Sequence, residues 1–194
     1  AQTAFVTNSG DNTVSVIDVA TNTVTTTISV GANPWGISIN QDGTKVYVAN
    51  NEDNTISVIN TTSNSVSATI SVGNAPTGVA VRPDGTKVYV TNFSDNSVSV
   101  IDTSTNMVST TIAVGNFPWG ISTSPDGTMA YVVNSLDNTI SVIDTFTNTV
   151  SNTITVGSLP TGISVSPNGT KIYVTNLNDN TVSVIDATSY MVSN

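Results

Sequence analysis

The acidic residues that could do chemistry in this chain recur at one fixed spacing. Carboxylate and amide oxygens could hold Ca²⁺, which takes roughly six to eight oxygen ligands, several of them concentrated within about a dozen residues. Each of the loops concerned has one Asp here, apart from the Glu52–Asp53 pair. We therefore favour Asx turns that bond backbone amides, and we expect no metal or other cofactor. The pairs are Asp11–Asn12, Asp53–Asn54, Asp95–Asn96, Asp137–Asn138 and Asp179–Asn180.

Residue types that commonly act in catalysis are missing. The chain has no His and no Cys, which excludes an imidazole base, a Ser-His-Asp triad, thiol nucleophiles and disulfides. A pair of carboxylates could still act as acid and base, but a catalytic residue should be unique to one unit, and the acids here repeat. We therefore expect a protein that is not an enzyme. The main departures from the repeat form no catalytic set: Glu52, Arg82, Phe93, Met129, Phe146 and Tyr190.

The charge content is low and mostly acidic. Charged residues make up 9% of the 194 residues, and the formal net charge is −9. This balance disfavours binding to nucleic acid and to anionic lipid, because both need clustered cations. No run of about 18 apolar residues is present, so we expect no membrane insertion. No signal peptide is visible, and the opening residues AQTAFVTN resemble a mature protein after signal removal.

The acidic pairs belong to a 42-residue unit made of four short β patterns. In the unit 76–114 these are TGVAVR, KVYVTN, SVSVID and MVSTTIAV, with the turn residues PDG after the first. β-branched residues at period two are typical of half-buried strands, and short connections make consecutive strands antiparallel. Four such strands in each unit indicate a blade of a β-propeller. We favour this fold over a β-solenoid, which needs shorter, parallel coils.

An acidic residue ends the third strand of most units. The second unit has Asn60 in its place, so no charge is required there. We expect these side chains to cap the strand or to bond the following turn. The acids are Asp18, Asp102, Asp144 and Asp186.

The phrases YVTN, PDGTKVYVTN and SVIDT resemble the YVTN-repeat family of β-propellers over essentially the whole chain. That family is best known from archaeal and bacterial surface-layer proteins. The resemblance implies an all-β propeller of four-stranded antiparallel blades in one domain, 1–194. It implies no single activity, because related propellers include surface proteins, lactonases, lyases and cofactor-bearing dehydrogenase subunits. The repeats lie near 1–34, 35–76, 77–118, 119–160 and 161–194.

The first unit lacks its innermost strand. With strands named A to D outward from the axis, the chain begins at strand B (3–8) and stops partway along a D strand. The A strands are expected near 36–40, 78–82, 120–124 and 162–166. Strand B of the first unit then has an unpaired edge, and such edges invite pairing with another chain. Three arrangements are compatible: a five-bladed ring with one thin blade, several copies in an assembly, or part of a longer propeller.

Apolar residues gather at the end of the expected propeller where the D-to-A and B-to-C connections meet. Trp35 and Trp119 follow Pro in two of the D-to-A loops, and Thr77 and Thr161 take that place in the others. The Trp side chains either pack between neighbouring blades, which we favour, or face a ligand. Apolar side chains on polar loops can mark an interaction surface. The candidate binding residues are Trp35, Phe93, Phe117, Trp119, Leu136, Leu159 and Leu177.

These features lead to one expected function and two alternatives. We expect a non-enzymatic, extracellular or cell-surface module, structural or adhesive, that contacts a protein or a carbohydrate through this loop face. The first alternative is a self-assembling subunit that forms a homo-oligomer, ring or fibre, through its open edge. The second is a metal-dependent propeller like the lactonases or lyases.

Overall fold

The computed structural model describes residues 2–193, so Ala1 and Asn194, the ends of the expected domain, lie outside the described residues. The described chain consists of strands and turns, apart from one 3₁₀ turn, η1 (Phe93–Asp95). None of its helical segments is long and apolar enough to cross a membrane. The expected all-β class is confirmed.

The strands form five antiparallel sheets, each made of strands that follow one another in the chain. Blade 1 is β1 (Thr3–Asn8), β2 (Thr13–Asp18) and β3 (Thr23–Ser29). Blade 2 is β4 (Pro34–Ile39), β5 (Lys45–Asn50), β6 (Thr55–Asn60) and β7 (Ser65–Ser71). Blade 3 is β8 (Pro76–Val81), β9 (Lys87–Asn92), β10 (Ser97–Asp102) and β11 (Met107–Ala113). Blade 4 is β12 (Pro118–Thr123), β13 (Met129–Asn134), β14 (Thr139–Asp144) and β15 (Thr149–Thr155). Blade 5 is β16 (Pro160–Val165), β17 (Lys171–Asn176), β18 (Thr181–Asp186) and β19 (Val192–Ser193).

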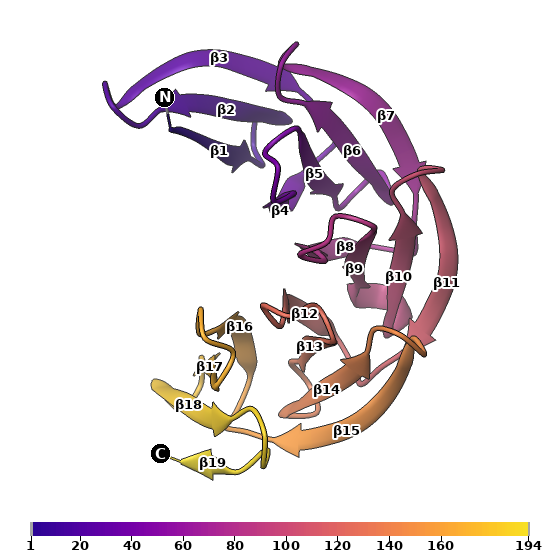
Figure 1. The fold of residues 1–194 in the computed structure, drawn as a ribbon, viewed down its shortest axis with the longest axis vertical. Helices are drawn as coiled ribbons and strands as arrows, with labels where there is room; N and C mark the ends of the chain where they lie inside the picture. Colours follow the sequence, from indigo (N-terminus) through magenta and orange to yellow (C-terminus); the bar gives the residue numbers. More distant parts are fainter. Residues whose placement is uncertain (1, 194) are drawn as a thin grey trace.

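The sheets radiate around a common axis as the blades of a propeller, with β4, β8, β12 and β16 innermost (Figure 1). Blade 1 has three strands, since β1 has no partner on its axial side within the described residues. The expected β-propeller with a thin first blade is therefore confirmed.

The blades form an open arc (Figure 1). The inner strands contact one another in sequence, β1 with β4, β4 with β8, β8 with β12 and β12 with β16. Blades 1 and 5, in contrast, lie on opposite sides of a gap in Figure 1. Residues 2–193 therefore do not form the closed five-bladed ring that was the first of the three expected arrangements.

The strand boundaries follow the sequence pattern, with one systematic shift. The B and C strands have the expected bounds, whereas each A strand begins two residues early, at Pro34 in blade 2. This happens because Pro34 pairs with Asn50, and an irregularity in register separates that pair from Ile37–Val48. A Pro is tolerated as the first residue of a strand, where no ladder N–H is needed.

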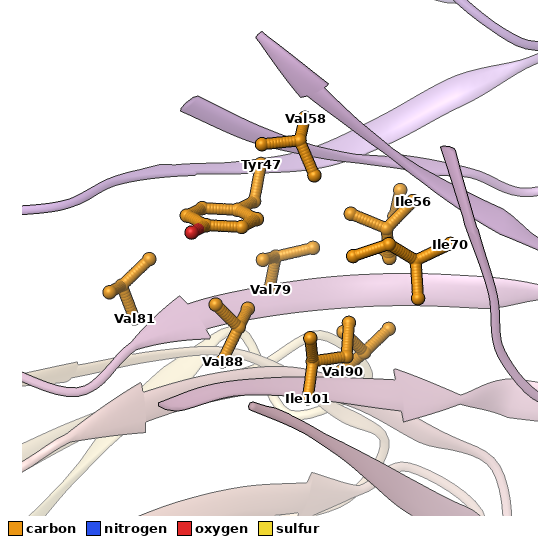
Figure 2. Close-up of a cluster of buried hydrophobic side chains, with 10 residues drawn as sticks. Tyr47, Ile56, Val58, Ile70, Val79, Val81, Val88, Val90 and Ile101 are labelled. Carbon is orange, nitrogen blue, oxygen red and sulfur yellow. The ribbon is translucent and has the colours of Figure 1, made fainter. Parts of the chain in front are cut away.

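The hydrophobic core lies between neighbouring blades rather than within one sheet. Figure 2 shows the cluster between blades 2 and 3, with Tyr47, Ile56 and Val58 facing residues of the next blade. Similar clusters fill the other three spaces between neighbouring blades. Blades 2, 3 and 4 are thus buried on both faces, and β5 is apolar or buried at nearly every position. The blade 3 side of the cluster in Figure 2 is Val79, Val81, Val88, Val90 and Ile101.

Candidate functional site

The repeated Asp-Asn pairs hold the loops of the candidate binding face. The Asp53 carboxylate accepts a hydrogen bond from the Ala32 amide at 2.7 Å, and the Asn12 side-chain oxygen accepts one from the Asn33 amide at 2.8 Å. The backbone of Asn51 also bonds to Asn33, at 3.0 Å. The expected bonding to backbone amides is present, but the local Asx turn is wrong: each acceptor lies 21 residues from its donor. The pairs join B-to-C loops to D-to-A loops.

The same contact recurs in the following blades. Asp95 and Asp137 accept bonds from the Asn74 and Asn116 amides, each at 2.7 Å. The Asn74 amide and side chain lower the pKa of Asp95, and the Asn116 side chain and amide lower the pKa of Asp137. Across residues 2–193, no group of three or more His, Cys, Asp or Glu side chains could hold a metal. The carboxylates of Asp53, Asp95 and Asp137 hold neighbouring loops of this face together.

The acids that end the C strands accept hydrogen bonds from turns at the opposite end of the propeller. Asp102 Oδ1 accepts bonds from the amides of Ser104 and Thr105, at 2.9 and 3.3 Å. Asn60 Oδ1 accepts the equivalent bonds from Thr62 and Ser63. Both the charged Asp102 and the neutral Asn60 thus accept hydrogen bonds from the following turn, as expected.

Asn50, which closes the second YVTN-type phrase, anchors the start of the D-to-A loop that precedes its blade. Asn50 donates from Nδ2 to Thr55 Oγ1 and Ser57 Oγ, both at 2.9 Å, and accepts at Oδ1 from the Gly31 amide at 3.1 Å. A Cβ on Gly31 would lie 2.6 Å from Asn50 Cγ and from Asp53 Oδ2, so the loop can approach only at Gly. The sequence marked this Asn by its recurrence alone and gave no sign of its three partners.

The D-to-A loops reach the axis through a left-handed residue. Phe117 and Leu159 have φ values of 55° and 49°, and Asn33 and Ala75 take the same place in their loops. This backbone region is costly for bulky side chains. Here the Phe117 amide donates to Asn96 Oδ1 at 3.0 Å, and the Leu159 amide donates to Asn138 Oδ1 at 2.8 Å. The Asp-Asn pairs thus hold Phe117 in a strained position that directs its loop.

Four of the sequence-predicted residues form one aromatic cluster. Trp35 and Trp119 meet edge to face, with ring centroids 5.0 Å apart, although blade 3 lies between their blades. Phe93 stacks on Phe117 at 4.5 Å and meets Trp119 edge to face at 5.5 Å. Such aromatic pairs contribute about 0.5–1.5 kcal/mol each beyond burial. Trp119 therefore packs against the adjacent blade 3 through Phe93, as we favoured, and it also contacts Trp35 across the propeller, which the sequence did not predict.

The cluster remains open to solvent. Trp35 and Phe117 are each 40% exposed, while Phe93 and Trp119 are half-buried. Exposed aromatic faces beside polar loops are available for stacking against a ligand.

A central cavity of about 670 Å³ lies beside the Trp pair. It is lined by the Pro-x-Gly segments of the inner strands and by hydroxyl groups, and no charged side chain is part of its lining. Ideal Cβ atoms on Gly36 and Gly78 would collide with the carbonyl oxygens of Thr77 and Trp119, so these glycines let the inner strands touch. Sequence reasoning missed the hydroxyls of Thr7, Ser9 and Thr175, whose only signal is their place at the ends of the B strands.

Of the seven candidate residues, only Trp35 and Trp119 line this cavity. Leu136 and Leu177 are 58% and 60% exposed on B-to-C loops, and Leu159 is half-buried. None of the three lines the central cavity. The structure therefore brings together four of the seven predicted residues.

Comparisons with known proteins support the fold. A family model described as a YNCE-like beta-propeller matches residues 1–84. A structure of Kuenenia stuttgartiensis hydrazine synthase is similar over 95% of this chain and 73% of that one, at 19% identity and a TM-score of 0.78. A functionally unknown protein from Desulfotomaculum acetoxidans is similar over 97% of this chain, at 22% identity and a TM-score of 0.84. The present chain spans 64% of that protein. A search of the curated proteins found no match.

These findings confirm the resemblance to β-propellers of the YVTN type. At such low identity the two solved structures bear on the fold alone. The fold is compatible with a non-enzymatic role and equally with an enzymatic one.

Proposed function

We propose that this β-propeller is a non-enzymatic binding module of the cell exterior, and that its aromatic cluster and central cavity hold a carbohydrate. The observation that carries the proposal is the contact of four aromatic side chains from three blades beside an opening lined by hydroxyls. Indole faces can stack on a sugar ring, and hydroxyl and backbone groups can bond its hydroxyls.

The charge of the site favours a neutral ligand. The cavity lining carries no charged side chain, whereas the whole chain has a formal net charge of −9. An acidic ligand would meet repulsion from the protein and no cation in the cavity. A neutral oligosaccharide avoids both costs.

The non-enzymatic role and the location rest on separate observations. The chain has neither His nor Cys, and its acids bond amides of loops and turns. Thr, Ser and Asn replace charged residues over much of the chain, in keeping with the resemblance to surface-layer propellers. Detection in the cell-wall or culture fraction of the source cells, rather than in the cytosol, is the expected outcome for location.

The two tryptophans provide the test, because they are the only ones in the chain. Neutral oligosaccharides such as cello-, manno- and chito-oligomers should change the intrinsic Trp fluorescence in a saturable way. Trp119→Ala should weaken binding about tenfold or more, equivalent to about 1.4 kcal/mol. The control is Phe146→Ala, which removes an aromatic ring that is 90% exposed elsewhere.

Two further measurements separate binding from folding. Circular dichroism of Trp35→Ala and Trp119→Ala should match that of the unmodified protein. Thermal unfolding should show destabilisation only by the lost aromatic pairs, about 0.5–1.5 kcal/mol each. Unfolding of these variants, or the absence of saturable binding by every neutral oligosaccharide tested, would contradict the proposal.

A further inference from the structure

Two of the residues that depart from the repeat, Met129 and Tyr190, meet at a cavity between blades 4 and 5, which are neighbours in Figure 1. The cavity has a volume of about 420 Å³ and lies between A-to-B and C-to-D turns, at the end of the propeller opposite the aromatic cluster. This volume is within the range of roughly 300–1,000 Å³ that is usual for small-ligand sites. We call it the turn-end cavity, defined by Ser124, Asp126, Met129, Tyr131, Gly169 and Tyr190.

The equivalent space between blades 3 and 4 is filled by a guanidinium group of the chain itself. Arg82 Nε donates to the Gly127 carbonyl oxygen at 2.9 Å, and Arg82 Nη1 lies 3.1 Å from Asp84 Oδ2. A second cation is close by, because Lys87 Nζ donates to the Thr145 carbonyl oxygen at 3.3 Å. The molecule thus shows how a cation is bound between the turns of two neighbouring blades.

Neither cation has a counterpart between blades 4 and 5. Ser124 stands at the position of Arg82, and Met129 stands at that of Lys87, one 42-residue unit further along the chain. As residues 2–193 describe the lining of the turn-end cavity, Asp126 is its one charged side chain. The place that the guanidinium group fills between blades 3 and 4 is therefore open space beside a carboxylate.

Two hydrogen-bond acceptors at this cavity have no partner within residues 2–193. Asp126 accepts its hydrogen bonds from Ser124 and Thr128 at Oδ1, which leaves Oδ2, the atom that pairs with a guanidinium group in blade 3. The Gly169 carbonyl oxygen is the other, since Ala187 replaces the Thr whose hydroxyl bonds this carbonyl in blades 2, 3 and 4. The Ser124 hydroxyl and the Thr128 amide lower the pKa of Asp126, so its carboxylate is charged at neutral pH.

An apolar and aromatic wall lies beside these acceptors. Tyr131 is buried, and Met129 and Tyr190 pack half-buried against the same hydrophobic cluster. Tyr190 has a φ of 58°, a left-handed conformation that is costly for a bulky residue. Its ring can attract a cation, and strain of this kind is concentrated at binding sites. The other four blades have Asn at this position: Asn22, Asn64, Asn106 and Asn148.

We propose that the turn-end cavity binds a small guanidinium compound that carries an apolar or aromatic group. Its planar group occupies the place that Arg82 has between blades 3 and 4, with one N–H donating to Asp126 Oδ2 and another to the Gly169 carbonyl oxygen. Its apolar part contacts Met129 and the ring of Tyr190. A neutral compound would leave the carboxylate unpaired, and the net charge of −9 disfavours an anion.

Isothermal titration calorimetry with benzylguanidine at neutral pH tests the proposal. The compound should bind saturably at one site per chain, and benzylurea, which has a similar shape and no charge, should bind about fivefold more weakly or worse. Asp126→Asn should weaken the binding of benzylguanidine by a similar factor. This variant should fold, because Asn168 takes the same place in blade 5 and accepts the equivalent hydrogen bonds from Ser166 and Thr170.

Matched variants keep this test decisive. Asp42→Asn makes the same change in the corresponding turn of blade 2, outside the cavity, and should bind like the unmodified chain. Ser124→Arg should abolish binding, because its own guanidinium group then fills the cavity as Arg82 fills the preceding space.

If Ser124→Arg fails to fold by circular dichroism, Tyr190→Asn replaces it. This change restores the residue of the repeat and should weaken binding about threefold through the lost aromatic ring. The proposal is overturned by the absence of saturable binding at millimolar benzylguanidine, by equal affinity for benzylurea, by an equal loss in Asp42→Asn, or by unchanged affinity in a folded cavity variant. The turn-end cavity lies away from the aromatic cluster, so carbohydrate binding succeeds or fails independently.

Discussion

At the scale of single residues, one buried side chain, that of Asn50, is hydrogen-bonded at both of its polar atoms. Asn50 is fully buried and makes three hydrogen bonds, two as donor and one as acceptor. Asn50→Ala should lower the free energy of unfolding by about 2 kcal/mol, because Thr55, Ser57 and the Gly31 amide lose their partner. Urea denaturation measures this. Asn152→Ala is the control, since Asn152 is exposed and bonds only its neighbour; an equal loss in both variants would contradict the role given to Asn50.

The Asp-Asn pairs lead to a dependence of stability on pH. Bonds from Asn74 and Asn116 lower the pKa of Asp95 and of Asp137 below the ordinary value of 3.8. A lowered pKa in the folded state adds stability above the unfolded value, and this stability is lost as the pH falls through the folded values. The urea midpoint should therefore decrease from about pH 4 downward. Asp95→Asn with Asp137→Asn should flatten this decrease, and an unchanged slope would show that other carboxylates cause it.

The sequence predicted the hydrogen bonds of the Asp-Asn pairs only in part. Asp and Asn beside a turn indicate bonds to backbone amides, and such bonds are present. The donors, however, belong to a loop 21 residues away. A local pattern carries no information on which loop folds back over it, because that depends on how consecutive blades stack.

At the scale of strands and blades, one residue position is buried or exposed according to its neighbours. Tyr47 and Tyr173 occupy the same place in β5 and β17, yet they are 1% and 43% exposed. Tyr47→Ala should cost about 3–5 kcal/mol of unfolding free energy, as for other large buried side chains. Tyr173→Ala should cost less than about 1 kcal/mol, because its ring is largely open to solvent among the described residues. Chemical denaturation of the two variants measures the difference, and equal losses would mean that the Tyr173 side chain is buried in solution.

The strands themselves were largely predictable. Alternating β-branched residues located the B and C strands to the residue, because such alternation reflects the pleat directly. The A strands begin two residues earlier than predicted, at Pro34 and its equivalents. Gly and Pro interrupt the alternation there, so the pattern could not show that the strand continues through an irregular register.

At the scale of the whole molecule, the curvature of the arc determines a side-chain contact that the sequence did not predict. Trp35 and Trp119 are 84 residues apart in the sequence, and their contact depends on how sharply blades 2, 3 and 4 bend around the axis. That bend comes from inner strands that touch at Gly36 and Gly78. The repeat predicted that the two Trp side chains lie at the same end of the propeller. It did not predict their contact, because that depends on the angles between consecutive blades.

The open arc also predicts a gradient of stability along the chain. In repeat architectures each unit is stabilised mainly by its neighbours. Within residues 2–193, blade 3 has two neighbouring blades, whereas blades 1 and 5 have one each. Amide hydrogen exchange should therefore be slowest in β9 and β10 and at least tenfold faster in β17 and β18, because end blades open locally at a lower free-energy cost. Equal protection in all five blades would mean that the arc unfolds as a single unit, so that the contacts between blades are strong enough to offset the missing neighbour at each end.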